Sequence, residues 1–219
     1  MTERLLSLLF DQEVSKDAAD AIRTVIADDP NNLLSRKAHA KTKLLFKQKL
    51  FARCLPILAK GFYTSKDVCK VSHLYALSYL LQHVQKAALI SEIDKVLPMV
   101  ITSLQLTDPA LKVTSLETLK AIVQDEPKTV SSQISTLVPL LMSISTFSNK
   151  TDQNNTPHAR IAALGILGML PSRIEYAVLH PFIGNVLRGL QVTLDDPKRV
   201  VRRCAANTRA IWCMPFSNE

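Results

Sequence analysis

The sequence of 219 residues has little glycine, few aromatic residues and no long apolar stretch. It contains five glycines and one tryptophan, and no strand-like alternation of apolar and polar residues competes with helical spacing. No apolar run approaches the roughly 20 residues that a membrane-spanning helix needs. The N-terminal residues include no cleavage site of small residues, so we expect no secretory signal peptide. The sequence predicts an all-helical protein without a membrane segment.

Patterns of catalytic and metal-binding residues are also scarce. The four cysteines form no C-x-x-C pair and have no histidine at zinc-site spacing, so we expect them to be buried or half-buried structural thiols. Phosphate-binding loops, serine-nucleophile motifs and zinc-protease motifs are absent from the sequence. We therefore predict no catalytic residue, no cofactor and no metal, and an enzyme is the least favoured interpretation. The cysteines are Cys54, Cys69, Cys204 and Cys213.

What the sequence does contain is a repeat. Pro56, Pro98, Pro139 and Pro181 lie 42, 41 and 42 residues apart, and the apolar residues around Pro56 recur 42 positions later around Pro98. A period of this size is typical of stacked helical hairpins. It predicts an all-α, HEAT/armadillo-type right-handed solenoid of about five hairpins that forms a single domain over residues 1–219. The repeating leucines are Leu55, Leu74 and Leu77 in one copy and Leu97, Leu116 and Leu119 in the next.

Residues 1–30 are expected to form a partial or atypical first repeat. The periodic prolines fall in the first helix of each later hairpin and should kink it. Asp108, Thr156 and Asp196 each precede a proline and are expected to cap the second helices. Residues 149–155 are predicted to form a flexible polar loop. The successive repeats are expected at residues 31–84, 88–124, 129–171 and 174–213.

Charge is distributed unevenly along the chain. The net charge is +8, yet residues 1–30 hold three basic and seven acidic side chains, whereas residues 31–70 hold ten basic and one acidic. The basic stripe at 31–60, which includes Lys43 and Lys47, could dock an acidic protein surface or nucleic-acid phosphates, or could be an ordinary solvated face. These alternatives stay open, with a protein partner favoured over nucleic acid. Phe46 and Phe51 within the stripe are expected in the core.

A second basic cluster lies near the C-terminus, where residues 194–202 read LDDPKRVVR, with the D-P-x-x-x-V-R pattern of a HEAT second helix. We expect Arg202, and Arg160 one repeat earlier, to pair with the turns of neighbouring repeats. Thr114 stands at this position in the third repeat. Trp212 could either anchor a partner or cap the last core. The remaining candidates for partner binding are Lys198, Arg199, Arg203 and Arg209.

Several segments resemble one protein family. LLFKQKLF at residues 44–51 and LPILAKGF at 55–62 resemble the C-terminal HEAT domain of the MMS-nineteen (methyl-methanesulfonate-sensitivity) family. RIAAL at 160–164 and the segment 194–202, followed by Trp212, are similar to the last two repeats of that family. The resemblance covers roughly residues 33–212.

The resemblance implies a non-catalytic scaffold of the cytosolic iron-sulfur assembly targeting complex, which helps deliver clusters to apoproteins of DNA repair and replication. The implied partners are a small MIP-eighteen-type protein, a WD-repeat propeller, and clients such as iron-sulfur helicases and polymerases, in the cytoplasm and nucleus. The cysteines are too scattered to ligate a cluster, so we expect the domain to bind the cluster carrier and not the cluster. A basic HEAT module that binds nucleic acid is the alternative.

Overall fold

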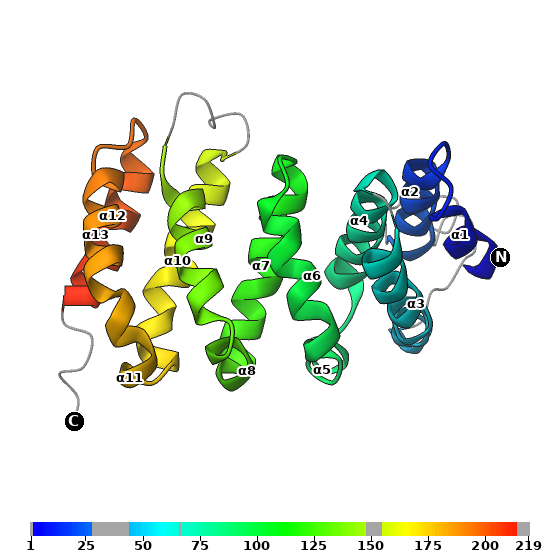
Figure 1. Cartoon of the computed structure of the whole chain (residues 1–219), viewed down its shortest axis with the longest axis horizontal. Coiled ribbons are helices and arrows are strands. Elements are labelled where there is room, and N and C mark those ends of the chain that lie inside the picture. Colours follow the sequence, from blue (N-terminus) through cyan, green and yellow to red (C-terminus); the bar gives the residue numbers. More distant parts are fainter. Residues whose placement is uncertain (1, 28–43, 66, 148–154, 214–219) are drawn as a thin grey trace. The chain divides into compact units, whose positions relative to one another are not determined.

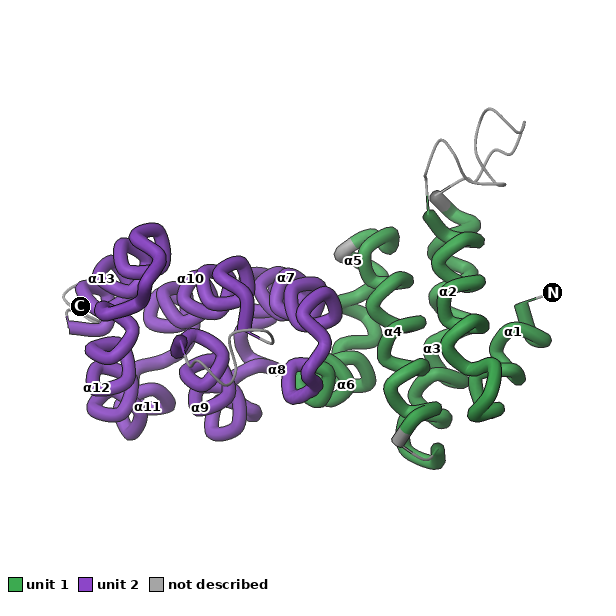
Figure 2. Tube along the Cα trace, turned by 90° about the horizontal axis from the view of Figure 1, so that it is seen from above, with its two compact units in different colours: residues 1–103 green, residues 104–219 purple. Residues whose placement is uncertain are grey.

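The computed structural model describes residues 2–27, 44–65, 67–147 and 155–213, and these residues form helices and turns without a strand. Figure 1 shows the helices in chain order. The chain divides into two compact units, residues 1–103 and 104–219, which are coloured separately in Figure 2. Each unit is a stack of helical hairpins, so the predicted fold class, an all-α solenoid of HEAT type, is confirmed within each unit.

The first unit contains two complete hairpins. Helix α1 pairs with α2 and α3 pairs with α4, while α2 packs along α4, so that second helices stack on second helices. The helices of this unit are α1 (Thr2–Leu8), α2 (Ser15–Ile26), α3 (Leu44–Thr64), α4 (Asp67–His83), α5 (Lys86–Ile90) and α6 (Ile93–Gln105).

The second unit repeats this arrangement. Helix α9 pairs with α10 and α12 pairs with α13, while α7, α10 and α13 pack successively on one another. The third predicted hairpin, 88–124, is divided between the two units, so its pairing stays a prediction. The helices of this unit are α7 (Pro109–Asp125), α8 (Pro127–Ser131), α9 (Ile134–Ser145), α10 (Pro157–Arg173), α11 (Tyr176–Leu179), the 3-10 helix η2 (His180–Phe182), α12 (Ile183–Thr193) and α13 (Arg199–Cys213).

The periodic prolines lie in first helices, as predicted, but the helices are interrupted elsewhere. Helix α3 continues through Pro56, whereas Pro98 and Pro139 each form the sixth residue of a helix that restarts after a short break. The hydrogen bond that each of these two prolines lacks would have ended in the first turn of its restarted helix. The interruption of each of these first helices therefore precedes its proline, while the expected kink at the proline itself stays a prediction. Pro181 lies in η2.

The repeating leucines make the core of each unit. All six are at most 2% exposed, and burying a leucine side chain contributes roughly 1.5–3 kcal/mol. In the first unit the core also forces a close approach between α3 and α4, because a Cβ on Gly61 would fall 2.0 Å from Nε2 of His73. Any larger residue at that position would require the His73 side chain to shift. The 42-residue spacing therefore marks residues that are buried in the core of their own unit.

The second helices begin at capped turns, with one departure from prediction. Oδ1 of Asp108 accepts a hydrogen bond from the backbone N–H of Leu111 at 2.7 Å, and Oγ1 of Thr156 accepts one from Ala159 at 3.3 Å. These two caps are confirmed. Asp196 does not cap in this way, since α13 begins only at residue 199 and the Asp196 carboxylate has other partners. Most of the predicted loop at 149–155 lies outside the described residues.

Candidate protein-interaction surface

The outer face of α13 carries exposed basic side chains. Helix α13 has four arginines and no acidic residue. Arg199 and Arg203 are exposed and form no ion pair within the described part of the chain. Together with Val200, which is 51% exposed, they line a hollow of about 360 Å³. We call Lys198, Arg199, Val200 and Arg203 the α13 surface. It combines positive charge with exposed apolar area, a combination that suits a protein partner.

A buried ion pair holds the turn from which α13 begins. Nε of Arg160 lies 2.8 Å from Oδ2 of Asp196, and both side chains are at most 1% exposed. Oδ1 of Asp196 accepts hydrogen bonds from Nη2 of Arg160 at 3.3 Å and from the backbone N–H of Lys198 at 2.8 Å. Nη1 of Arg202 donates to the carbonyls of Asp196 and Pro197 at 2.7 and 3.1 Å. Buried contacts within the second unit therefore hold the turn at which the α13 surface begins.

The same kind of contact joins the preceding hairpins. Nη1 of Arg160 donates to the carbonyl of Asn155 at 2.6 Å, and Nζ of Lys112 donates to Oδ1 of Asn155 at 3.0 Å. Lys112, Arg160 and Arg202 each occupy the fourth position of their helix. Lys112 and Arg160 each reach a turn of the next hairpin, and we call these contacts the basic ladder. The prediction for Arg160 is confirmed, whereas Arg202 bonds to the turn of its own hairpin.

Sequence reasoning missed Lys112 because it counted from the Asp-Pro pair of the last repeat. Helix α13 starts two residues after its proline, whereas α7 starts at Pro109 itself, so the same count gives Thr114 instead of Lys112. Counting from the first helical residue would have found it. Burial lowers the pKa of Lys112 from its usual value of 10.5. Asn155, predicted within the flexible loop, is only 7% exposed and holds this lysine.

Trp212 and Arg209 lie less openly than the α13 surface. Trp212 is 1% exposed, and its Nε1 donates to the carbonyl of Leu167 at 2.8 Å. Its placement is that of the core-capping alternative, and its ring is not available as an anchor. Arg209 is half-buried, and its Nε has no hydrogen-bond partner among the described residues. The exposed candidates near the C-terminus are therefore Lys198, Arg199 and Arg203.

The basic stripe contains both buried and exposed side chains. Lys47 is buried at 5% exposure and makes contacts of its own, and Lys43 lies outside the described residues. Lys49, Arg53 and Lys60 are exposed on α3. Phe51 lies in the core as expected, but Phe46 is 46% exposed, which corrects the prediction for that residue. The outward face of α3 thus keeps three cations of the stripe.

The cysteines and histidines form no metal site within the described ranges, where no three of His, Cys, Asp and Glu gather. Cys54 and Cys69 are buried as predicted and Cys204 is half-buried, but Cys213 is exposed. Burial raises the pKa of Cys54 to about 11, so its thiol stays protonated at neutral pH. The imidazole of His73 is fully buried, and its Nδ1 lies 2.6 Å from the carbonyl of Cys69.

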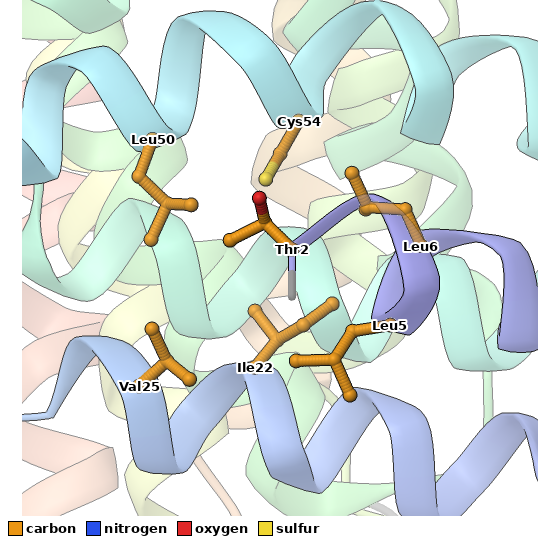
Figure 3. A pocket seen from close by; sticks show the side chains of 7 residues that line it. All are labelled: Thr2, Leu5, Leu6, Ile22, Val25, Leu50 and Cys54. Atoms are coloured by element: carbon orange, nitrogen blue, oxygen red, sulfur yellow. The ribbon is translucent and has the colours of Figure 1, made fainter.

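Cys54 also borders a small cavity in the first unit, seen in Figure 3. Its volume is about 10 Å³, which is close to the least that one water molecule needs. Leucine side chains from α1 and α3 and the side chains of Ile22 and Val25 from α2 surround it. This cavity is an apolar packing gap between three helices. Although the hydroxyl group of Thr2 also borders it, the cavity lacks the volume of a ligand site.

In each unit the helical hairpins stack with second helix on second helix, and this arrangement defines the class of helical-repeat proteins. A family model described as "RNAPII transcription regulator C-terminal" (MMS19_C) matches residues 1–171, and the chain belongs to that family. The chain is similar to the "MMS19 nucleotide excision repair protein homolog" of Bos taurus, with 30% identity over 97% of this chain and 20% of the relative.

Two other relatives give the same picture. The "DNA repair/transcription protein mms19" of Schizosaccharomyces pombe is 33% identical over 95% of this chain and 20% of its own length. The "MMS19 nucleotide excision repair protein homolog" of Dictyostelium discoideum is 33% identical over 91% of this chain and 18% of its own length. The chain thus spans about a fifth of the length of these relatives. It belongs to a family of DNA repair and transcription proteins. No described helix combines the length and the apolar character needed to cross a bilayer.

Proposed function

We propose that this chain is a non-catalytic protein-interaction scaffold that binds components of cytosolic iron-sulfur assembly and helps deliver clusters to apoproteins of DNA repair and replication. Its mechanism is affinity and positioning. Membership in a family of DNA repair and transcription proteins supports the proposed link to DNA repair. The observation that supports a binding role is the α13 surface. There, Arg199 and Arg203 are exposed, without an ion pair among the described residues, on a helix whose start is held by the buried pair Arg160–Asp196.

The proposed partners are a small MIP-eighteen-type protein and a WD-repeat propeller, with iron-sulfur helicases and polymerases as clients in the cytoplasm and nucleus. Arginine is enriched among the residues that dominate protein interfaces, because its planar guanidinium can bind carboxylates in a bidentate manner. The α13 surface presents two such groups beside exposed Val200. We therefore expect an acidic patch with an apolar centre on the protein that binds there.

A charge reversal tests this surface. The double variant Arg199→Glu/Arg203→Glu should bind the small MIP-eighteen-type protein at least roughly 30-fold more weakly, because truncation of interface hot spots costs about 2 kcal/mol or more. Helical content measured by circular dichroism should not change, since both side chains are exposed. Arg173→Glu, an exposed arginine at the end of α10, is the matched control. Equal affinity of the double variant and the control would rule out the α13 surface.

Nucleic-acid binding is the second candidate, and the exposed Lys49, Arg53 and Lys60 of α3 favour it. Among the described residues, the acidic neighbour of Arg53 is Glu3, with Nη2 and Oε1 4.0 Å apart. Binding through these cations would weaken steeply with salt, because each neutralised phosphate releases counterions. Fluorescence anisotropy with a labelled single-stranded or duplex oligonucleotide, at two salt concentrations, measures this dependence. An affinity that does not change with salt concentration, or that is unchanged in Lys49→Glu/Arg53→Glu, would contradict this role.

A further inference from the structure

A groove of about 380 Å³ lies between α9 and α12 in the second unit. Pro139, Met142 and Ser143 line it from α9, and Phe182, Val186 and Gly189 line it from η2 and α12. Its volume is within the range of sites that bind small ligands or peptide side chains. It does not involve the α13 surface, which lies on another helix.

Helices α9 and α12 make less contact with each other than α10 and α13 do, and the groove lies between them. Where the two helices come together, a Cβ on Gly189 would fall 2.3 Å from the terminal methyl carbon of Met142. The hydroxyls along the groove are turned to their own helix, since Ser143 donates to the carbonyl of Leu140 at 2.8 Å and Thr146 to that of Met142 at 2.9 Å. The groove therefore offers mainly apolar contact.

The charge around the groove is unusual for a protein whose residues are 21% charged. Helix α9 has no charged residue at all, and α12 has a single one, Arg188. Interface cores are depleted of charged residues, except that arginine is enriched, whereas an ordinary solvated helix face carries many charges. The uncharged character of two neighbouring helices therefore points to contact with another molecule.

Arg188 is held at the edge of this groove. Its Nη2 donates to Oδ1 of Asn185, a lining residue, at 2.7 Å, and its Nε donates to the carbonyl of Gly184 at 3.3 Å. The side chain is exposed and forms no ion pair with the described residues. The guanidinium is thus oriented by its own helix and still has donors for a carboxylate.

We propose that the α9–α12 groove binds a peptide segment of a partner protein. The segment places one or two large apolar side chains in the groove and pairs an aspartate or glutamate with Arg188. Because Arg188 bonds to a lining residue one turn away on the same helix, the acidic residue lies within about four positions of the apolar anchor. This second docking surface is independent of the proposed role of the α13 surface.

The test is selection from a phage-displayed library of random twelve-residue peptides on the whole chain, followed by anisotropy titration of the enriched peptide. Ser143→Phe fills the groove at the cost of one hydrogen bond within α9, and Arg188→Glu reverses the charge at its edge. Each should weaken the peptide at least tenfold. Ser135→Phe, exposed on α9 outside the groove, and Arg173→Glu are the matched controls and should leave binding unchanged. Circular dichroism establishes that every variant is folded.

Enriched peptides that carry an acidic residue within four positions of a large apolar one, and that need both Ser143 and Arg188, support the proposal. Absence of enrichment, peptides without an acidic residue, or equal binding to Ser143→Phe would overturn it. A concentration-dependent dimer that Ser143→Phe abolishes, measured by sedimentation, would instead assign the groove to a second copy of the chain. Arg203→Glu should not affect the peptide, which separates this test from that of the α13 surface.

Discussion

Replacing Asp196 with asparagine should destabilise the second unit strongly, although the two side chains have nearly the same shape. Asp196 is the counter-charge of Arg160, and the two side chains are 0% and 1% exposed. Asparagine can still accept the hydrogen bonds from Nη2 of Arg160 and from the N–H of Lys198, but it removes the negative charge that faces the buried guanidinium. The charge of the carboxylate, and not its shape, is what the substitution removes.

The size of the effect follows from the burial of the pair. Removing one partner of a buried ion pair costs about 3–5 kcal/mol, and the hydrogen bonds that asparagine keeps place Asp196→Asn near the lower end, at about 3 kcal/mol. This is a large part of the roughly 5–15 kcal/mol by which domains are stable. At a urea dependence of about 2 kcal/mol per molar, the midpoint should fall by about 1.5 M.

Trp212 makes the measurement direct, because it is the single tryptophan of the chain and is buried in the same unit. Its fluorescence should report urea unfolding around the Arg160–Asp196 pair. Asp195→Asn, at the exposed neighbouring position, is the matched control and should change stability by no more than about 0.5 kcal/mol. If Asp196→Asn and Asp195→Asn have the same midpoint, the reasoning about the buried pair is wrong.

Three further predictions concern buried groups, and all can be measured by urea unfolding. Gly61→Ala should lower the free energy of unfolding by about 1–3 kcal/mol, because the new methyl group would meet His73. In the control Gly165→Ala, where a Cβ meets nothing within 4 Å, the free energy of unfolding should rise by about 0.5–1 kcal/mol. Equal effects of the two substitutions would contradict the close approach at Gly61. Burial lowers the pKa of His73 from 6.5, so the stability contributed by the neutral imidazole is complete above that pH and is lost as the pH falls below it. Between pH 7.5 and 5.5, His73→Leu should therefore lose less free energy of unfolding than the wild type. The same dependence of stability on pH in both proteins would refute this. Lys112→Met should either leave the free energy of unfolding unchanged or raise it by up to about 1 kcal/mol, because it removes a desolvated ammonium group that donates to the uncharged amide of Asn155. A loss above about 2 kcal/mol would show that the contact with Asn155 outweighs the burial of the charge.

The fold could be predicted from the sequence because core spacing is a local, repeated property. Leu74 and Leu77 recur 42 residues later as Leu116 and Leu119, and all four are buried at equivalent places. The breaks before Pro98 and Pro139 could not be predicted in the same way. The missing hydrogen bond of a proline can be accommodated at several positions in the preceding turns, and packing selects among them.

The candidate site was only partly predictable, because the exposure of each side chain depends on which face of its helix is covered by other helices. Arg199 and Arg203 are exposed, but Trp212, only nine residues beyond Arg203, turns inward to the carbonyl of Leu167. The basic composition of the stripe likewise did not reveal that Lys47 is buried while Lys49 is exposed. The groove between α9 and α12 had no motif, and its one sequence signal was the near absence of charge.

The most direct test of the scaffold role is to combine this chain with the small MIP-eighteen-type protein and measure the mass of the product by size-exclusion chromatography with light scattering. The measurement is made at low and at moderate salt, with and without the WD-repeat propeller. The proposed function predicts a stable, stoichiometric complex that persists at moderate salt. Two separately eluting proteins at both salt concentrations, with and without the propeller, would contradict it.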